Sequence, residues 1–159
     1  TENSRTRPRL VTTDINGTVH YVYFDGKVET SEIHTFSPDH HFQYRDADGD
    51  GLKDFIFLDD NKLEVYKSTN KKLFEHAFDA KISDPPIYFH FSANDRKLGV
   101  FSEQNNQIYL LNSNGKMHLG FPLKGSTPFT IGYLDEKHNN FQLIVGDKTN
   151  FLYNYNVLR

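Results

Sequence analysis

The chain has 159 residues, the length of one ordinary domain, and it is long enough to bury a core of its own. Its 18 basic and 21 acidic residues give a net charge of −3 and are spread along the sequence, so no basic patch suggests nucleic acid as a partner. No apolar run approaches the roughly 20 residues of a membrane span, and the absence of cysteine excludes disulfides and thiol chemistry.

Aromatic residues dominate the apolar part of the composition. The chain holds 14 Phe and 9 Tyr against a single Met, and aromatic residues favour strands over helices. We therefore expect an all-β fold with almost no helix. The sequence opens on Thr1 without a start methionine or a signal peptide, so we also expect it to be a piece of a longer protein.

One repeat plan recurs four times along the chain: an apolar triplet, a polar turn and an alternating, aromatic-rich strand. The anchor residues of the triplets are Leu10, Phe55, Leu98 and Leu143, with spacings of 45, 43 and 45 residues. This period matches the length of a four-stranded β-meander. We expect a single domain over residues 1–159 with four repeat units, at about 8–38, 39–84, 85–127 and 128–159.

The first unit begins "RLVTTDINGTVHYV" at Arg9 and continues through an Asp25-Gly26 turn into a strand over residues 28–34. Asp-Gly pairs supply the positive φ angles that tight hairpin turns require. No segment in front of its triplet has the pattern of a leading strand. The first unit is therefore predicted to hold three strands.

The second and third units are predicted to be complete. Each has a leading strand, at residues 42–45 and 87–91, and a fourth strand after a tight turn, at residues 73–78 and 117–123. Prolines in "SDPPIYF" and "GSTPFTI" mark the joins to the next units, because proline cannot donate to a strand ladder. The fourth unit has a leading strand over residues 129–134 and lacks a final strand.

About 14 strands in units of this length predict a β-propeller-like array of about four four-stranded β-meander blades, the first and last incomplete. A β-sandwich built of similar hairpins is the alternative. A closed propeller shares a blade between its termini, and no segment here is left over to do so. We therefore expect a fragment of a larger propeller, whose flanks near residues 19–23 and 151–155 associate with upstream blades or form a homodimer.

The stretch "DADGDGLKD" places aspartates at the first, third, fifth and ninth positions of residues 46–54. Calcium prefers about six to eight oxygen ligands, and the two glycines let the backbone curl so that alternate carboxylates converge. The predicted calcium ligands are the side chains of Asp46, Asp48, Asp50 and Asp54 and the carbonyl of Leu52. An EF-hand is excluded because its twelfth position, a glutamate, is Phe57 here. The alternative is a solvated acidic turn.

The segment "RDADGDGLKDFIFLDDNKLEVYK" resembles the FG-GAP or VCBS-type repeat of integrin-like propellers and of many bacterial surface proteins, in which a D-x-D-x-D-G-x-x-D loop opens a blade and binds calcium. The resemblance is specific over residues 44–66 and implies a calcium-binding propeller blade. Residues 135–139 in the fourth unit, and Asn94 and Asp95 in the third, resemble decayed copies of the loop, so the metal role is carried over to one loop only.

No catalytic constellation is found in the sequence. It has no nucleophile elbow, no phosphate-binding glycine loop and no H-E-x-x-H motif. The adjacent His40 and His41 are predicted to point to opposite sides of an extended segment, and the acidic pair Asp59-Asp60 lies in a predicted turn. We therefore expect the chain not to be an enzyme.

These features give a functional hypothesis: a non-catalytic, calcium-stabilised binding or scaffold module of a larger bacterial envelope or secreted protein. Calcium loops of modest affinity suit the millimolar calcium outside the cytoplasm, which favours a secreted, periplasmic or cell-surface location. No motif specifies whether the ligand is a protein or a glycan. The alternative is an accessory domain of a carbohydrate-active enzyme whose catalytic domain lies upstream.

Overall fold

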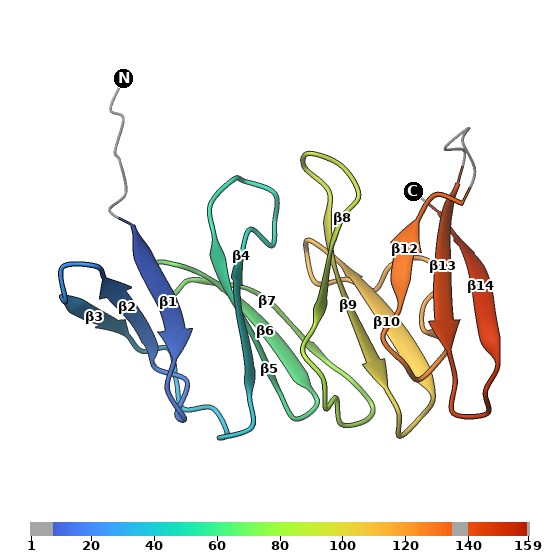
Figure 1. The fold of residues 1–159 in the computed structure, drawn as a ribbon, viewed down its shortest axis with the longest axis horizontal. Helices are drawn as coiled ribbons and strands as arrows, with labels where there is room; N and C mark the ends of the chain where they lie inside the picture. The colour runs from blue at the N-terminus through green and yellow to red at the C-terminus, as the bar shows by residue number, and fades with distance from the viewer. Residues whose placement is uncertain (1–7, 135–139, 159) are drawn as a thin grey trace.

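The computed structural model describes residues 8–134 and 140–158. Its regular structure consists of fourteen β-strands, and these described residues contain no helix (Figure 1). The all-β prediction is therefore confirmed. Within the same ranges, no segment forms a helix with the length and apolar character needed to cross a membrane.

The strands pair into four antiparallel sheets, each built from neighbours in the sequence. The first sheet contains β1 (Arg9–Thr13), β2 (Val19–Tyr23) and β3 (Val28–Ser31). The second contains β4 (His41–Arg45), β5 (Asp54–Asp59), β6 (Lys62–Lys67) and β7 (Lys72–Ala77). The third contains β8 (Ile87–His90), β9 (Arg96–Ser102), β10 (Gln107–Asn112) and β11 (Leu123–Lys124). The fourth contains β12 (Thr130–Gly132), β13 (Phe141–Gly146) and β14 (Leu152–Val157). Four sheets, with three strands in the first and last, are as predicted.

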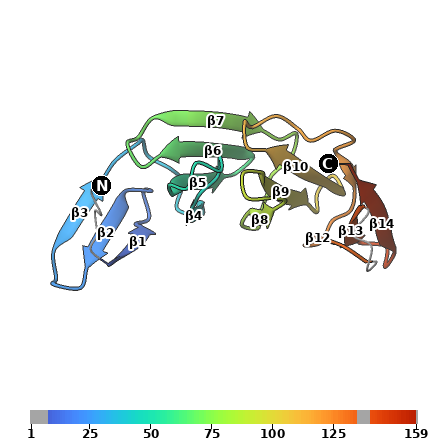
Figure 2. The same ribbon diagram turned by 90° about the horizontal axis from the view of Figure 1, so that it is seen from above.

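The four sheets stand side by side in chain order (Figure 1). Seen from above, the row curves: β1, β4 and β8 lie on its concave side, whereas β3 and β7 lie on its convex side (Figure 2). The first and fourth sheets are at opposite ends of the row in both views. Each sheet thus turns the edge of its first strand toward the concave side.

Alternating side chains of the middle strands fill the spaces between neighbouring sheets. In β5, Phe55 and Phe57 pack against the first sheet, while Ile56 and Leu58 pack against the third. All four side chains are at most 1% exposed, because successive residues of a strand point to opposite faces. The continuous apolar run "FIFL" therefore marks a strand that is buried on both faces.

The third and fourth sheets pack by the same alternation. Leu98 and Val100 of β9 face the second sheet, whereas Phe101 belongs to the cluster shared with the fourth sheet. Gly99 also lies on that side, and a Cβ atom there would stand 2.5 Å from the ring of Phe129. Glycine at this position permits the close approach of the two sheets.

Three of the four anchor residues face the preceding sheet, and Leu10 lies on the equivalent face of the first sheet. Phe55, Leu98 and Leu143 are buried, at 0%, 3% and 0% exposed, but Leu10 of the first sheet is 61% exposed. Leu10 lies in register with Val22 on β2, which pairs in turn with Val28 on β3. Within the described residues no sheet covers this face of the first sheet, which therefore presents an apolar row at the position that is a sheet interface in the other three units.

The uncovered face at the other end has a different composition. Tyr153 and Tyr155 of β14 pack against the cluster between the third and fourth sheets. The opposite face carries Asn154 and Asn156, and Asn156 accepts a hydrogen bond from Gln142 Nε2. Of the apolar flank expected near residues 151–155, the tyrosines are thus turned inward, whereas Phe151 and Leu152 are 64% and 73% exposed.

The fourth strand of the third unit differs from its prediction. Instead of a strand over residues 117–123, there is an isolated bridge between Leu111 and Met117, and the strand β11 is only Leu123–Lys124. A turn separates them, in which the Phe121 amide donates to the His118 carbonyl. Gly120, at φ +89°, places the chain in a conformation incompatible with a strand.

Candidate metal centre

The acidic loop connects β4 to β5, and its two ends are the paired residues Arg45 and Asp54. Gly49 and Gly51 have φ angles of +82° and +85°, the left-handed conformation that glycine adopts readily. Gly49 also approaches the β8–β9 loop so closely that a Cβ atom would lie 2.8 Å from the carbonyl oxygen of Asn94. The loop therefore curls as the glycine spacing predicts and rests on its counterpart in the third sheet.

Aspartate side chains hold the curled backbone from within. Asp46 accepts hydrogen bonds from the amides of Gly49 at 2.7 Å and Gly51 at 3.1 Å. Asp50 Oδ1 accepts from the amide of Leu52 at 2.8 Å, and the Leu52 side chain is exposed. Such contacts between side chains and backbone amides fix the shape of the loop.

Three of the predicted ligands lie together. Asp46, Asp48 and Asp50 each place one carboxylate oxygen within 4.8 Å of the other two. Asp54, at the start of β5, is fully buried; its Oδ2 atom accepts a hydrogen bond from the Ala47 amide at 2.8 Å. The other oxygen, Asp54 Oδ1, has no partner in hydrogen-bonding geometry.

Lys67 is a member of this site that the sequence analysis missed. It ends β6, directly across the ladder from Asp54. Its Nζ atom lies 2.7 Å from Asp48 Oδ2, 2.7 Å from Asp50 Oδ2 and 3.2 Å from Asp54 Oδ1. Since the last contact is not a hydrogen bond in its geometry, it is an ion pair only. Three carboxylate oxygens thus converge on one cation.

The pKa values follow from this geometry. Burial pulls the pKa of Lys67 down, but the hydrogen bonds to the aspartates outweigh it and raise the pKa above the usual lysine value. The bond from Lys67 lowers the pKa of Asp50. Burial raises the pKa of Asp54, because removal from water disfavours the charged carboxylate. Lys67 is accordingly a firmly charged ammonium among carboxylates.

The third sheet completes the surroundings of the loop. Arg96 Nη2, from the start of β9, lies 3.8 Å from Asp46 Oδ2. The hydroxyl of Tyr88 on β8 donates to the backbone carbonyl of Asp46. The loop is therefore braced by two sheets, and changes in it will be felt at their interface.

The residues present fit a calcium ion. Every ligand that the loop offers is oxygen, as calcium requires, and the buried Asp54 Oδ1 atom has no hydrogen bond to lose. The position on which Asp48, Asp50 and Asp54 converge is that of the Lys67 ammonium. Calcium at this point would require the Lys67 side chain to move outward.

The counterpart loop in the third sheet, between β8 and β9, has the opposite charge arrangement. Lys97 occupies the place of Asp54, and Asn112 lies across the ladder from it. Lys97 Nζ donates to Asn112 Oδ1 at 2.8 Å and to Asp95 Oδ1 at 3.0 Å. This loop holds its own cation and offers little to a metal. The corresponding loop of the fourth unit, residues 135–139, lies outside the described residues.

The other candidate residues have separate partners. His40 Nδ1 contacts the Ser37 carbonyl at 2.6 Å, whereas His41 Nε2 contacts the Ser83 carbonyl at 2.9 Å. Asp59 accepts a hydrogen bond from the Ser37 amide at 2.8 Å. The structure thus does not bring the two imidazoles onto one point.

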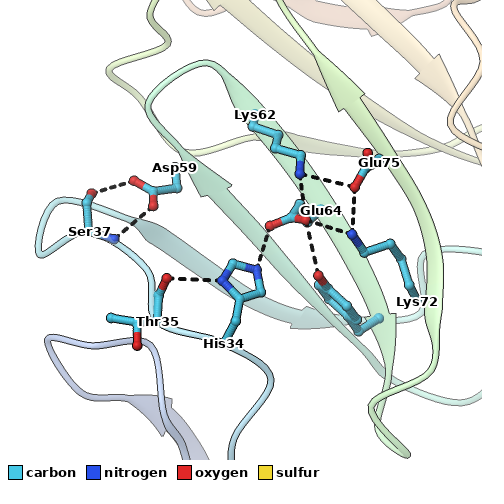
Figure 3. A network of polar contacts seen from close by, with 9 residues as sticks. His34, Thr35, Ser37, Asp59, Lys62, Glu64, Lys72 and Glu75 are labelled. Atoms are coloured by element: carbon cyan, nitrogen blue, oxygen red, sulfur yellow. Dashed lines mark hydrogen bonds and ion pairs between the residues drawn. The ribbon is translucent and has the colours of Figure 1, made fainter.

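A second polar cluster surrounds Glu64 on β6 (Figure 3). Glu64 is 4% exposed, and its Oε1 atom lies 2.9 Å from Lys72 Nζ and 3.0 Å from Lys62 Nζ. Its Oε2 atom contacts His34 Nε2 at 2.8 Å, which ties the segment after β3 to the second sheet. Burial opposes ionisation, but these partners outweigh it and lower the pKa of Glu64 to about 2. The charged groups of this cluster are therefore neutralised by one another.

Comparisons with known proteins include a distant structural likeness. No protein-family model matches the chain, and no curated protein matches it. Among solved structures, it aligns with the 1.35 Å crystal structure of a protein of unknown function from Bacteroides caccae, at 15% identity and a TM-score of 0.38. That alignment covers 92% of this chain and 59% of the other, so the chain spans little more than half the length of that protein.

Proposed function

We propose that the chain is a non-catalytic, calcium-stabilised binding or scaffold module, built as a β-propeller-like array and belonging to a larger secreted or envelope protein of a bacterium. The observation that carries the proposal is the convergence of Asp48, Asp50 and Asp54 oxygens on one point, with the carboxylate of Asp46 beside them. Three such oxygens already hold a cation, the Lys67 ammonium.

Calcium would be held by the carboxylates of Asp46, Asp48, Asp50 and Asp54 and by the Leu52 carbonyl. Its double charge would neutralise more of the carboxylate repulsion than a single ammonium does. The loop lies against the β8–β9 loop at Gly49, so an ordered loop also supports the contact between the second and third sheets. Calcium of modest affinity suits a location where calcium is millimolar, outside the cytoplasm.

The propeller-like arrangement is supported by the packing of the sheets. Antiparallel meanders of three or four strands follow one another in chain order and pack face to face, with their first strands toward a common concave side (Figure 2). The apolar row of Leu10, Val22 and Val28, whose two ends Leu10 and Val28 are exposed, then belongs against a further sheet. That sheet comes from upstream residues of a longer protein or from a second copy of the chain.

Light scattering tests what covers the apolar row on the outer face of the first sheet. If a second copy covers it, the mass should exceed the 18.5 kDa monomer as concentration rises, and Leu10→Glu should restore the monomer. If upstream residues cover it, Leu10→Glu should destabilise only the longer protein. A monomer at every concentration, together with a longer protein that tolerates Leu10→Glu, would contradict both forms of the proposal.

Thermal unfolding tests the calcium role. Calcium at a hundredfold excess over its dissociation constant should stabilise the fold by about 2.7 kcal/mol relative to protein in chelator. Asp48→Ala should lose most of this gain, whereas Asp39→Ala, an exposed aspartate outside the loop, should keep it. An unmutated protein whose melting temperature ignores calcium would overturn the proposal.

A further inference from the structure

A small open cleft lies between the acidic loop and the first two strands of the third sheet. Its volume is about 230 Å³, less than the range of drug-sized pockets. The side chains that shape it are Tyr44, Arg45, Lys53, Tyr88, His90 and Arg96. No aliphatic side chain of the described residues lines it, so the cleft presents charges, aromatic rings and polar atoms to a ligand.

The cleft is positively charged on a chain whose net charge is −3. Arg45, Lys53 and Arg96 face a single carboxylate, Asp46, which already accepts hydrogen bonds from two loop amides. Among the described residues, no carboxylate pairs with Arg45 or Lys53; each has only an aromatic ring as its partner. Two cations at the mouth of this cleft thus remain available to an anion.

The cations are held in place before any ligand arrives. The guanidinium of Arg45 lies 5.4 Å from the ring centroid of Tyr88, and the Lys53 ammonium lies 5.4 Å from that of Tyr44. Contacts between cations and aromatic rings restrain such long side chains. Arg96 is more deeply set, with its side chain 11% exposed, and it donates to the Ser92 carbonyl. Restrained donors lose less entropy when a ligand binds.

We propose that this cleft binds a uronic acid unit of an acidic polysaccharide. The carboxylate would be held by Arg45 and Lys53, since guanidinium and ammonium groups make strong charge-assisted hydrogen bonds to carboxylates. The sugar hydroxyls would meet His90 and the tyrosines. A protein ligand would need an apolar anchor, for which this smaller cleft has no aliphatic wall. The inference rests on the proposed binding function and names its ligand class.

A neighbouring cleft extends the site toward the first sheet. It measures about 580 Å³ and shares Tyr44, Gly51 and Lys53 with the smaller one. Its far side includes Arg9, whose guanidinium lies 4.0 Å from the ring centroid of Tyr21. A second restrained cation on the path away from Lys53 suits a ligand that repeats its carboxylates along a chain.

Titration calorimetry of the calcium-loaded protein with trigalacturonate tests this inference. We expect binding of trigalacturonate, and none of a neutral galactose trisaccharide or of hexa-aspartate. Arg45→Ala and Lys53→Glu should each weaken binding about tenfold or more, the effect of losing a charge-assisted bond. Lys116→Ala, at an exposed lysine on another loop, should bind as the unmutated protein does. Thermal unfolding of each variant shows that it is folded.

Three results would overturn the inference: no binding of trigalacturonate, binding of the neutral trisaccharide, or binding of hexa-aspartate. An equal loss in Lys116→Ala would also do so, because it would indicate a general attraction of polyanions. These failures are separate from that of the proposed calcium role. A protein that is stabilised by calcium but does not bind trigalacturonate contradicts the ligand assignment alone.

Discussion

The β4–β5 and β8–β9 loops occupy the same place in consecutive sheets and touch each other at Gly49 and Asn94. Each is followed by a strand that carries a buried charge within its first two residues. In the second sheet the charge is negative, Asp54, and Lys67 lies across the ladder from it. In the third sheet it is positive, Lys97, and Asn112 lies across.

The difference shows how the sign of one buried residue decides what a loop can bind. Lys97 is satisfied by neutral and acidic oxygens from its own sheet, and its loop needs no further ion. Asp54 requires a cation, because an unpaired buried carboxylate is costly. Within the chain that cation is Lys67, which shares its single charge among three aspartates. The shortage of positive charge among the aspartates of the β4–β5 loop is the basis of the proposed calcium site.

Removal of Asp54 should give the largest effect. In chelator, Asp54→Ala should destabilise the fold by about 3 kcal/mol, because it leaves the Ala47 amide unpaired and Lys67 short of a partner. Lys97→Met should cost only about 1 kcal/mol, since its stem keeps its packing and the side chain of Asp95 is 41% exposed to water. Urea unfolding measures both. A larger loss of stability from Lys97→Met than from Asp54→Ala would contradict the proposed difference between the two loops.

The contact between the two loops gives the next prediction. Gly49→Ala should destabilise by roughly 2 kcal/mol, because its φ is +82° and the added Cβ would meet the Asn94 carbonyl at 2.8 Å. Gly51→Ala is the matched control in the same loop: it has the same strain at φ +85° but open space around the Cβ, so we expect about 1 kcal/mol. Equal losses would mean that the loops do not press on each other.

Glu64 provides a buried acid whose cations are all supplied by the chain, and it predicts a pH dependence. Its folded-state pKa of about 2 lies below the ordinary value of 4.5, so its stabilisation is complete above pH 4.5 and is lost as the pH falls toward 2. Glu64→Gln should lower the free energy of unfolding by about 2 kcal/mol at pH 7, after allowance for screening. It should also reduce the loss of stability between pH 4.5 and pH 2. Urea unfolding between pH 2 and pH 7 is the measurement.

Its control is Glu75→Gln, which alters a partner of the same lysines that is 48% exposed. Here we expect a smaller loss of stability and a smaller change in the acid dependence than in Glu64→Gln, because water screens the charge of Glu75. If the Glu64→Gln protein retained the full loss of stability below pH 4.5, this loss would have to come from other carboxylates.

Replacement of Lys67 gives the smallest predicted effect. It distinguishes between the two cations that could neutralise the aspartates, the Lys67 ammonium and calcium. Lys67→Met should raise calcium affinity about tenfold, because calcium no longer competes with an ammonium for the same oxygens. The same variant should be less stable in chelator. Lys62→Met, on the same strand but in the Glu64 cluster, should leave calcium affinity unchanged. Unchanged affinity in Lys67→Met would show that the ammonium and the metal do not share a position.

The sequence predicted those features that depend on local spacing. The alternation of "FIFL" and the period between Leu10 and Leu143 follow from strand geometry, and the strands that they predicted are present. Residues 117–123 were wrongly predicted as a strand, because a turn at Gly120 and a proline at 122 outweigh their apolar character. Local spacing likewise explains why Gly49 and Gly51 have positive φ.

Features that depend on pairing between distant segments were missed. Lys67 reaches the acidic loop because the tight turn between β5 and β6 sets a register that joins it to Asp54. That register could have been counted from the turn. The cleft beside Arg45 and Arg96 could not, because it depends on how two sheets are placed against each other, which no local pattern specifies.

Calorimetric titration of calcium into chelator-treated protein tests the central claim most directly. We predict the binding of about one calcium ion per chain, lost in Asp48→Ala and tightened in Lys67→Met. Asp95→Ala, in the counterpart loop of the third sheet, should leave the titration unchanged. The absence of binding heat together with an unchanged melting temperature, or an equal loss in Asp95→Ala, would contradict the assignment of calcium to the loop of the second sheet.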